Sequence, residues 1–284
     1  MDLLICTTCG TQHEATSLTT CRICDDPRQF VPPTGPSFTT LRTLVESKKY
    51  RNEVRMDPYN SNMYSIWTEP TFAIGQRAIL LRSPKGNVLW DCISYIDQET
   101  VSAIKKLGGI SAIVISHPHF YSCHLEWAKL FDCPVYLATA DQEWRSRRNV
   151  AVQQDVVDRL SLCEGEFTAV QVGGHFPGSM VLHWQNKLLT ADSIMVVPSG
   201  MYDIDRQEGT ASFSFMWSYP NMIPLDPESI HGIWKNVESL EFDDCHSAWW
   251  GRDVRGNARK KVLKSAQISV KSMGHTSHQI LSLK

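Results

Sequence analysis

The stretch that decides the fold is Ser116-His117-Pro118-His119-Phe120-Tyr121-Ser122-Cys123-His124. It directly follows the apolar segment 111–116, which predicts a loop at the end of a buried strand. Two histidines at positions i and i+2 of an extended segment point to the same side. Both imidazoles can then reach one ion, so the sequence predicts a metal site at this strand end.

Three more metal-ligating side chains follow segments that we predict to be strands. His175 lies in the loop Gly173-Gly174-His175-Phe176-Pro177-Gly178-Ser179, Asp192 ends Leu188-Leu189-Thr190-Ala191-Asp192, and His246 follows Asp244-Cys245. Three histidines with an open position are typical of catalytic zinc, which lowers the pKa of bound water to about 7. We expect one tightly bound Zn²⁺ with a metal-bound hydroxide as nucleophile. Asp192 would orient this hydroxide or complete the coordination sphere.

The N-terminus carries a second pattern, in which Cys6-x-x-Cys9 is followed by Cys21-x-x-Cys24. Each pair places two thiolates on one tight turn, so the spacing predicts a closed tetrahedral Cys₄ zinc site. The segment has too little apolar content for its own core, so we expect the metal to fold it. Four protein ligands leave no open position, which indicates a structural or recognitive ion. A disulfide framework is the alternative, but nothing indicates an oxidising compartment.

The pattern along the chain predicts an α/β fold, because two runs of short apolar strands are each followed by helices. We expect a Cys₄ zinc-binding segment over residues 1–30 and a linker with a short helix over 31–57. The sheet-containing domain is expected over 58–256, and a basic helix and tail over 257–284. The predicted site residues all lie just past strand ends, where α/β folds place their sites.

Charge and hydropathy exclude several classes of function. The 284 residues include 28 Lys and Arg against 30 Asp and Glu, a formal charge of −2. This balance gives no electrostatic case for binding nucleic acid or an anionic membrane. The longest apolar runs are too short to span a bilayer, and the N-terminus lacks the features of a signal peptide. We therefore expect a cytoplasmic protein that acts on a small-molecule substrate.

The chain resembles the metallo-β-lactamase superfamily of metallohydrolases from about residue 62 to residue 252. The resemblance rests on the HxH loop, the Gly-Gly-His loop, the strand end at Asp192 and the late His246, in that order. Asp91, at the end of Val88-Leu89-Trp90-Asp91, matches the first motif of the family. The resemblance implies a four-layer αββα sandwich with the metals at one edge between the sheets. It makes His117, His119 and His175 the first metal site, with Asp192 as the bridging carboxylate.

The sequence departs from the family at the second metal site. The family pattern is His-x-His-x-Asp-His, and Tyr121 and Ser122 stand in place of its Asp and second-site His. Asp192 and His246 remain, and two ligands rarely hold an ion firmly. Cys123 and His124 are candidates to compensate. Tyr121 is a candidate hydrogen-bond donor to a developing oxyanion, with packing as the alternative.

The predicted function is hydrolysis at a carbonyl centre, such as a lactam, lactone or thioester. Phosphodiester hydrolysis usually uses two metals to clamp both oxygens, so the missing ligands count against a nuclease. The alternative is a binding protein that kept the fold, lost part of the site and docks a partner through its zinc ribbon. A redox function, with iron in place of zinc at the histidine site, is the third interpretation.

Overall fold

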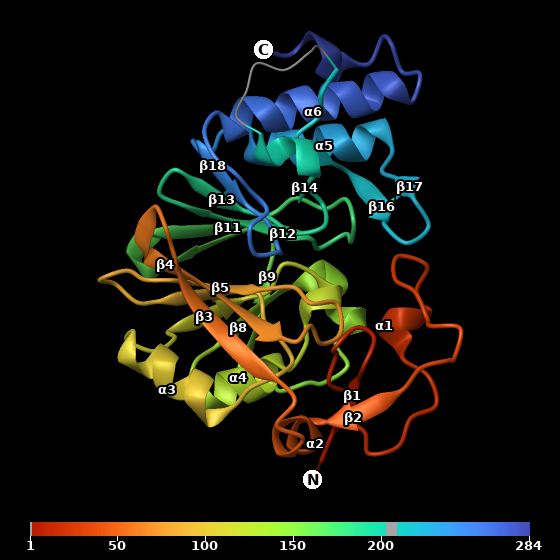
Figure 1. Ribbon diagram of the computed structural model, residues 1–284. Helices are drawn as coiled ribbons and strands as arrows, with labels where there is room; N and C mark the ends of the chain where they lie inside the picture. Colours follow the sequence, from red (N-terminus) through yellow and green to blue (C-terminus); the bar gives the residue numbers. More distant parts are fainter. Residues whose placement is uncertain (1, 203–208) are drawn as a thin grey trace. The chain divides into compact units, whose positions relative to one another are not determined.

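The structure is a computed structural model that describes residues 2–202 and 209–284. The chain divides into two compact units, Met1–Val156 and Val157–Lys284, here called the N-terminal and C-terminal units. Each unit is built on one large sheet with helices packed on it (Figure 1). The domain predicted over 58–256 therefore contributes to both units, and its residues 203–208 lie outside the described residues. None of the helices in the described ranges combines the length and the apolar character that a membrane span requires.

The sheet of the N-terminal unit has seven strands in chain order. They are β3 (Arg51–Asp57), β4 (Asn60–Glu69), β5 (Ala78–Leu81), β6 (Val88–Trp90), β7 (Ala112–Val114), β8 (Val135–Ala138) and β9 (Gln153–Val156). The first three pairings are antiparallel and the last three parallel. Helices α3 (Gln98–Lys106) and α4 (His124–Phe131) make the crossovers that the parallel pairs β6–β7 and β7–β8 require. Strands β5, β6 and β7 are buried throughout, which explains their continuous apolar sequences.

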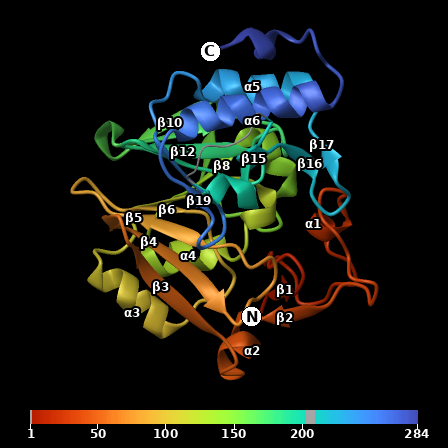
Figure 2. The ribbon, with the colours of Figure 1, turned by 45° about the horizontal axis from the view of Figure 1, so that its top comes forward.

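The sheet of the C-terminal unit has six strands. They are β10 (Arg159–Leu162), β11 (Phe167–Gln171), β12 (Met180–Trp184), β13 (Lys187–Leu189), β18 (Asp244–His246) and β19 (Asp253–Val254). Helices α5 (Pro227–Val237) and α6 (Ala258–Ser272) lie side by side and bury their apolar faces in one core with this sheet (Figures 1 and 2). Asp226 caps α5 by accepting from the Ser229 amide.

Short elements complete the C-terminal unit between β13 and β18. They are the ribbon β14 (Met195–Val196) with β15 (Phe213–Ser214) and the ribbon β16 (Met216–Ser218) with β17 (Ile223–Pro224). The 3₁₀ turns of this unit are η3 (Cys163–Gly165), η4 (Pro198–Met201) and η5 (Gln279–Ser282).

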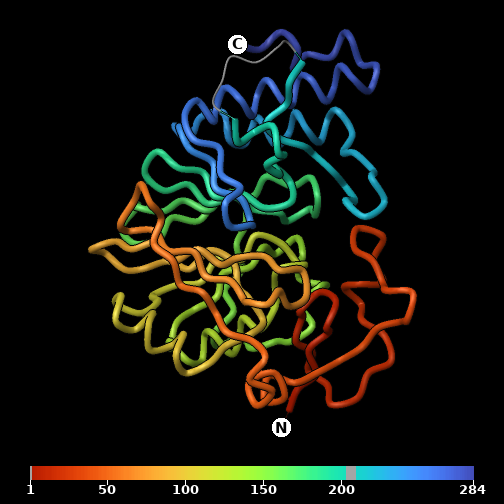
Figure 3. The backbone as a smooth tube through the Cα atoms, in the orientation of Figure 1, coloured from red at the N-terminus to blue at the C-terminus, as the bar shows by residue number. Residues whose placement is uncertain are grey.

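Residues 2–46 of the N-terminal unit form a small subdomain beside its sheet, red to orange in Figure 3. Strand β1 (Leu4–Cys6) pairs with β2 (Phe38–Thr40), and the helices are α1 (Arg22–Asp25) and α2 (Leu41–Glu46). The subdomain docks through its backbone, because Gly10 O accepts from Ser94 Oγ at 2.8 Å and the Gln12 amide donates to Ser122 O at 3.1 Å. The second bond ties it to the HxH loop.

Several strands were missed by the sequence analysis, among them β3, β9 and β10. The short helix predicted within residues 31–57 ends at Glu46, and β3 begins the sheet at Arg51, before the predicted boundary at 58. All three strands lie at sheet edges and carry polar or charged side chains. Charged side chains protect edge strands from pairing with other chains, and they also remove the apolar alternation on which strand prediction depends.

Candidate metal centre

The HxH pair lies in the N-terminal unit, directly after strand β7. The segment is not extended as we predicted, because residues Pro118–Phe120 form a 3₁₀ turn, η1. His117 and His119 are both buried, with ring centroids 5.2 Å apart. The two imidazoles are therefore brought together by a 3₁₀ turn and not by the extended segment that we predicted from their i and i+2 positions.

Asp91 and Ser116 fix the orientation of this loop. Asp91, at the end of β6, has the left-handed φ of 61°, and its Oδ1 accepts from the Ser116 amide at 2.7 Å. Ser116 Oγ lies 2.9 Å from His117 Nδ1. When Nδ1 donates this hydrogen bond, Nε2 carries the lone pair that a metal needs. Asp91 thus acts as a positioning residue for the HxH loop.

His175 and Asp192 lie in the C-terminal unit and approach each other. His175 is fully buried, and its Nδ1 lies 3.2 Å from Met216 O, so Nδ1 donates and Nε2 carries the lone pair. Nε2 lies 3.6 Å from Asp192 Oδ2. Two ligands of one tetrahedral ion at bond lengths near 2.1 Å lie about 3.4 Å apart. The pair therefore has the spacing and the donor chemistry of two ligands of one divalent ion.

The four predicted thiols form a cluster in the N-terminal unit. The Sγ atoms of Cys6, Cys9, Cys21 and Cys24 all lie within 4.8 Å of one another, and all four side chains are buried. The Cys6–Cys24 and Cys9–Cys21 Sγ distances are 3.6 and 3.7 Å. Ligands 2.3 Å from a tetrahedral zinc ion lie about 3.8 Å apart, whereas disulfide sulfurs lie about 2.05 Å apart. The geometry fits a zinc site and excludes disulfides between these pairs.

The sequence comparison identifies a relative that covers nearly the whole chain. The chain is 38% identical over 281 residues to the uncharacterized protein YmaE of Bacillus subtilis, covering 96% of this chain and 97% of that protein. The chain belongs to the YmaE family. A scan against protein-family models finds no match.

Solved structures with the same fold are far more distant in sequence. A metallo-β-lactamase from Hirschia baltica is 13% identical, with a TM-score of 0.52, and the match covers 77% of this chain and 97% of that one. A flavo-di-iron protein from Thermotoga maritima is 12% identical, with a TM-score of 0.50, over 77% of this chain and 61% of that one. This member of the YmaE family thus has the metallo-β-lactamase fold, as the resemblance implies.

His246 takes a different partner from the other predicted ligands of its unit. It ends β18, opposite Asp253 of β19, and its Nδ1 lies 3.3 Å from Asp253 Oδ1. His246 is fully buried. Among the described residues of the C-terminal unit, the structure brings His175 and Asp192 together as a ligand pair and places His246 with Asp253 instead.

The residues at the second-metal positions have their own partners in the N-terminal unit. Ser122 Oγ accepts from Gln76 Nε2 at 3.0 Å and donates to Cys92 O at 3.3 Å. Tyr121 Oη donates to Asp141 O at 3.5 Å. Burial and the Asp141 charge raise the pKa of Tyr121 far above its usual value, so the hydroxyl keeps its proton. These contacts favour the packing alternative for Tyr121, and its oxyanion role stays a prediction.

Tyr121→Phe separates the two roles. Since the hydroxyl already donates within its own unit, we expect the variant to lose about 1 kcal/mol of stability and to keep its turnover within a few-fold. Thermal unfolding and kcat measured on the same preparation check this. A loss of about 100-fold in kcat at an unchanged melting temperature would instead assign Tyr121 to the oxyanion.

Neither His124 nor Cys123 belongs to a cluster of metal-ligating side chains among the described residues. His124 Nδ1 donates to Tyr121 O at 2.8 Å, and Nε2 accepts from Gln153 Nε2 at 2.8 Å. Both ring nitrogens are therefore used, and burial lowers the pKa of His124 to about 4, so the ring stays neutral. Burial raises the pKa of the Cys123 thiol, which opposes the thiolate that a metal needs. His124 is a structural residue that joins α4 to β9.

Three residues that support His175 and Asp192 were missed by the sequence analysis. Ser193 Oγ accepts from the His175 amide at 3.1 Å and donates to Gly173 O at 2.6 Å, which holds the Gly-Gly-His loop. Tyr219 Oη donates to Asp192 O at 2.8 Å. Gly174 has a φ of 86°, and a Cβ there would lie 2.8 Å from Ile233 Cδ1. The sequence offered one signal for these supporting residues, which is that Ser193 directly follows the predicted ligand Asp192.

Proposed function

We propose that the chain is a zinc-dependent hydrolase that attacks a carbonyl centre in a small-molecule lactam, lactone or thioester. The proposed ligands of one ion are His117 and His119 from the N-terminal unit with His175 and Asp192 from the C-terminal unit. The order of these motifs along the sequence supports this set, as does the metallo-β-lactamase fold. When bound, the zinc ion supplies a Lewis acid and a water of lowered pKa.

The observation that carries the choice of reaction is the state of Tyr121 and Ser122. Both hydroxyls are engaged by partners in their own unit, and neither side chain provides the carboxylate or imidazole of a second site. One ion suits attack of water on a polarised carbonyl, whereas phosphodiester cleavage usually uses two.

The chain's own residues orient the reactants. Met216 O and Ser116 Oγ set the ring orientations of His175 and His117. Tyr219 holds the backbone of Asp192, which leaves the Asp192 carboxylate to contact His175 Nε2 and to accept a hydrogen bond from the attacking water. A carboxylate in this position acts as a general base.

Asp192→Asn tests this assignment. We expect kcat on the best carbonyl substrate to fall by about 100-fold or more, because the amide neither accepts a proton nor carries the charge. The screen uses a chromogenic β-lactam, a γ-lactone, a thioester and bis(p-nitrophenyl) phosphate. Asp158→Asn, at an exposed position with a φ of 57° that asparagine tolerates, is the matched control and should leave kcat unchanged.

The competing function is a binding protein that kept the fold. Its support is the same loss of second-site ligands, together with the Cys₄ subdomain at the surface of the N-terminal unit. Metal-loaded protein that turns over none of the carbonyl substrates would contradict the hydrolase and favour this alternative. Iron at the histidine site, with a redox function, would show in the metal analysis.

A further inference from the structure

A separate group of metal-ligating side chains lies in the C-terminal unit. Glu228 and His231 project from helix α5, and His278 lies in the C-terminal tail. One ligand atom from each of the three lies within 4.8 Å of the other two. Residues three apart on a helix share a face, so the first two form one side of the group and the tail provides the other.

Contacts between the three side chains hold their ligand atoms close together. His278 Nε2 lies 3.0 Å from Glu228 Oε1, and the rings of His231 and His278 lie 5.4 Å apart at 83°. His231 is only 4% exposed, and its Nδ1 is a buried nitrogen with no hydrogen-bond partner among the described residues. A buried imidazole without a full set of partners is unusual for a residue that serves packing alone.

We propose that Glu228, His231 and His278 form a further metal site, for a first-row divalent transition ion such as Zn²⁺. Two imidazoles and one carboxylate are a common zinc donor set, with water in the remaining position. Mg²⁺ and Ca²⁺ prefer oxygen ligands, so a site with two imidazole nitrogens does not suit these ions. All three residues belong to the C-terminal unit and none takes part in the proposed hydrolysis, so the proposal stands independently of that function.

The hydrogen bonds of His278 indicate which of its ring nitrogens carries a proton. His278 Nδ1 accepts from the Ile280 amide at 3.2 Å, which places the ring proton on Nε2. Metal binding at Nε2 moves that proton to Nδ1 and gives up the Ile280 bond.

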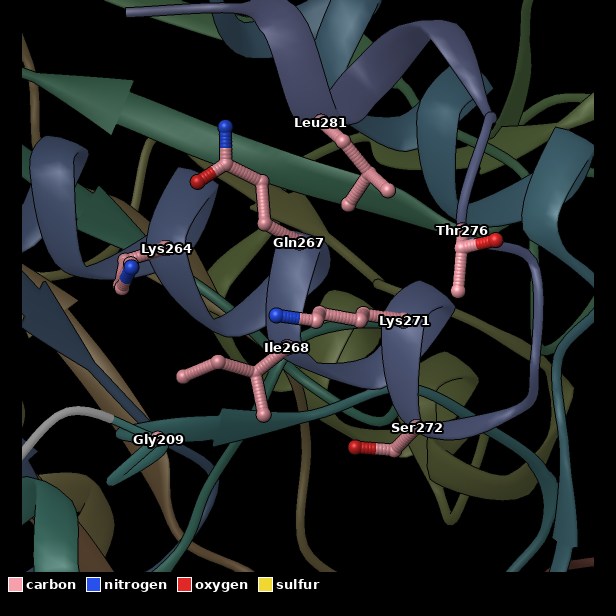
Figure 4. Close-up of a pocket in the computed structure, with 8 residues that line it drawn as sticks. All are labelled: Gly209, Lys264, Gln267, Ile268, Lys271, Ser272, Thr276 and Leu281. Carbon is pink, nitrogen blue, oxygen red and sulfur yellow. The ribbon is translucent and has the colours of Figure 1, made fainter.

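The site would hold the C-terminal tail on the unit. The tail already docks through buried Ile280 and through Gln267 Nε2 of α6, which donates to Ile280 O and Leu283 O. With α6, the tail lines a pocket of about 380 Å³, to which the tail contributes Thr276 and Leu281 and α6 contributes Gln267 and Lys271 (Figure 4). An ion at His278 would therefore fix one wall of this pocket to helix α5.

Zinc titration of the full-length, metal-loaded protein tests the site. We expect calorimetry to show one added Zn²⁺ per wild-type chain and hydrogen exchange to slow over residues 276–284. Glu228→Gln keeps an acceptor for His278 but removes the carboxylate, and His278→Ala removes an imidazole. Each should weaken the added site by more than about tenfold. His275→Ala, an exposed histidine of the same tail, is the matched control and should bind as wild type does.

Two results would overturn the proposal. One is the absence of an added ion in the wild type, and the other is an isotherm shared by wild type, Glu228→Gln and His278→Ala. Glu228 is an exposed side chain, so Glu228→Gln should fold even if His278→Ala loosens the tail.

Discussion

Replacing His117 and His119 together by alanine should remove one metal ion per chain and lower turnover by about 1000-fold or more. The variant removes two of the three proposed imidazoles, and His175 with Asp192 alone cannot hold an ion firmly. Metal content by mass spectrometry and kcat on the best carbonyl substrate are measured on the same sample. We expect the double variant to bind one ion fewer than the wild type, whatever total the wild type binds.

The double variant should remain folded, because its loop is anchored elsewhere. Asp91 Oδ1 still accepts from the Ser116 amide, and the Gln12 amide still donates to Ser122 O. His183→Ala is the control, since His183 is partly exposed and its Nε2 donates to Glu241 O. An unchanged metal count in the double variant would remove His117 and His119 from the site.

Cys9→Ser should remove a different ion and destabilise the N-terminal unit. The four thiols enclose the core of the Cys₄ subdomain, against which the side chains of Phe38, Ile74 and Trp144 pack. A segment whose core is this small obtains its folding free energy from the metal, so we expect a loss of the order of 5 kcal/mol or more. Thermal unfolding and zinc content check this.

The effect should extend to the metal centre, because the subdomain is bonded to the HxH loop. Gln12 donates to Ser122 O, and Arg147 joins Gln12 Oε1 to Glu126 of α4. Turnover should therefore fall together with zinc content in Cys9→Ser. Cys163→Ser, at a partly buried single cysteine, should change neither. A Cys9→Ser variant with full activity and stability would show that the zinc is dispensable for the fold.

The sequence predicted the strands and ligands whose signal is local. Strands β5 to β7 are continuous apolar runs, and the CxxC pairs define a metal site by spacing alone. The charged strand β3 was missed because it is held as a strand by its pairing with β4 and not by an apolar pattern of its own. The 3₁₀ turn at the HxH loop was also missed, although Pro118 stands at its first position.

The roles of individual side chains depended on partners distant in the sequence. His124 was a candidate ligand until its bond to Gln153, 29 residues away, showed both ring nitrogens to be used. His246 faces Asp253 across a strand pair that the sequence did not indicate. No local pattern distinguishes a ligand histidine from a hydrogen-bonded one, so these assignments required the structure.

We propose that His117, His119 and His175 bind the same ion, and metal counting tests this proposal most directly. His117→Ala/His119→Ala and His175→Ala should each lack one ion relative to wild type. The triple variant His117→Ala/His119→Ala/His175→Ala should also lack one ion and no more. A triple variant that lacks two ions would contradict the account, because it would show that the two histidine groups bind separate metals.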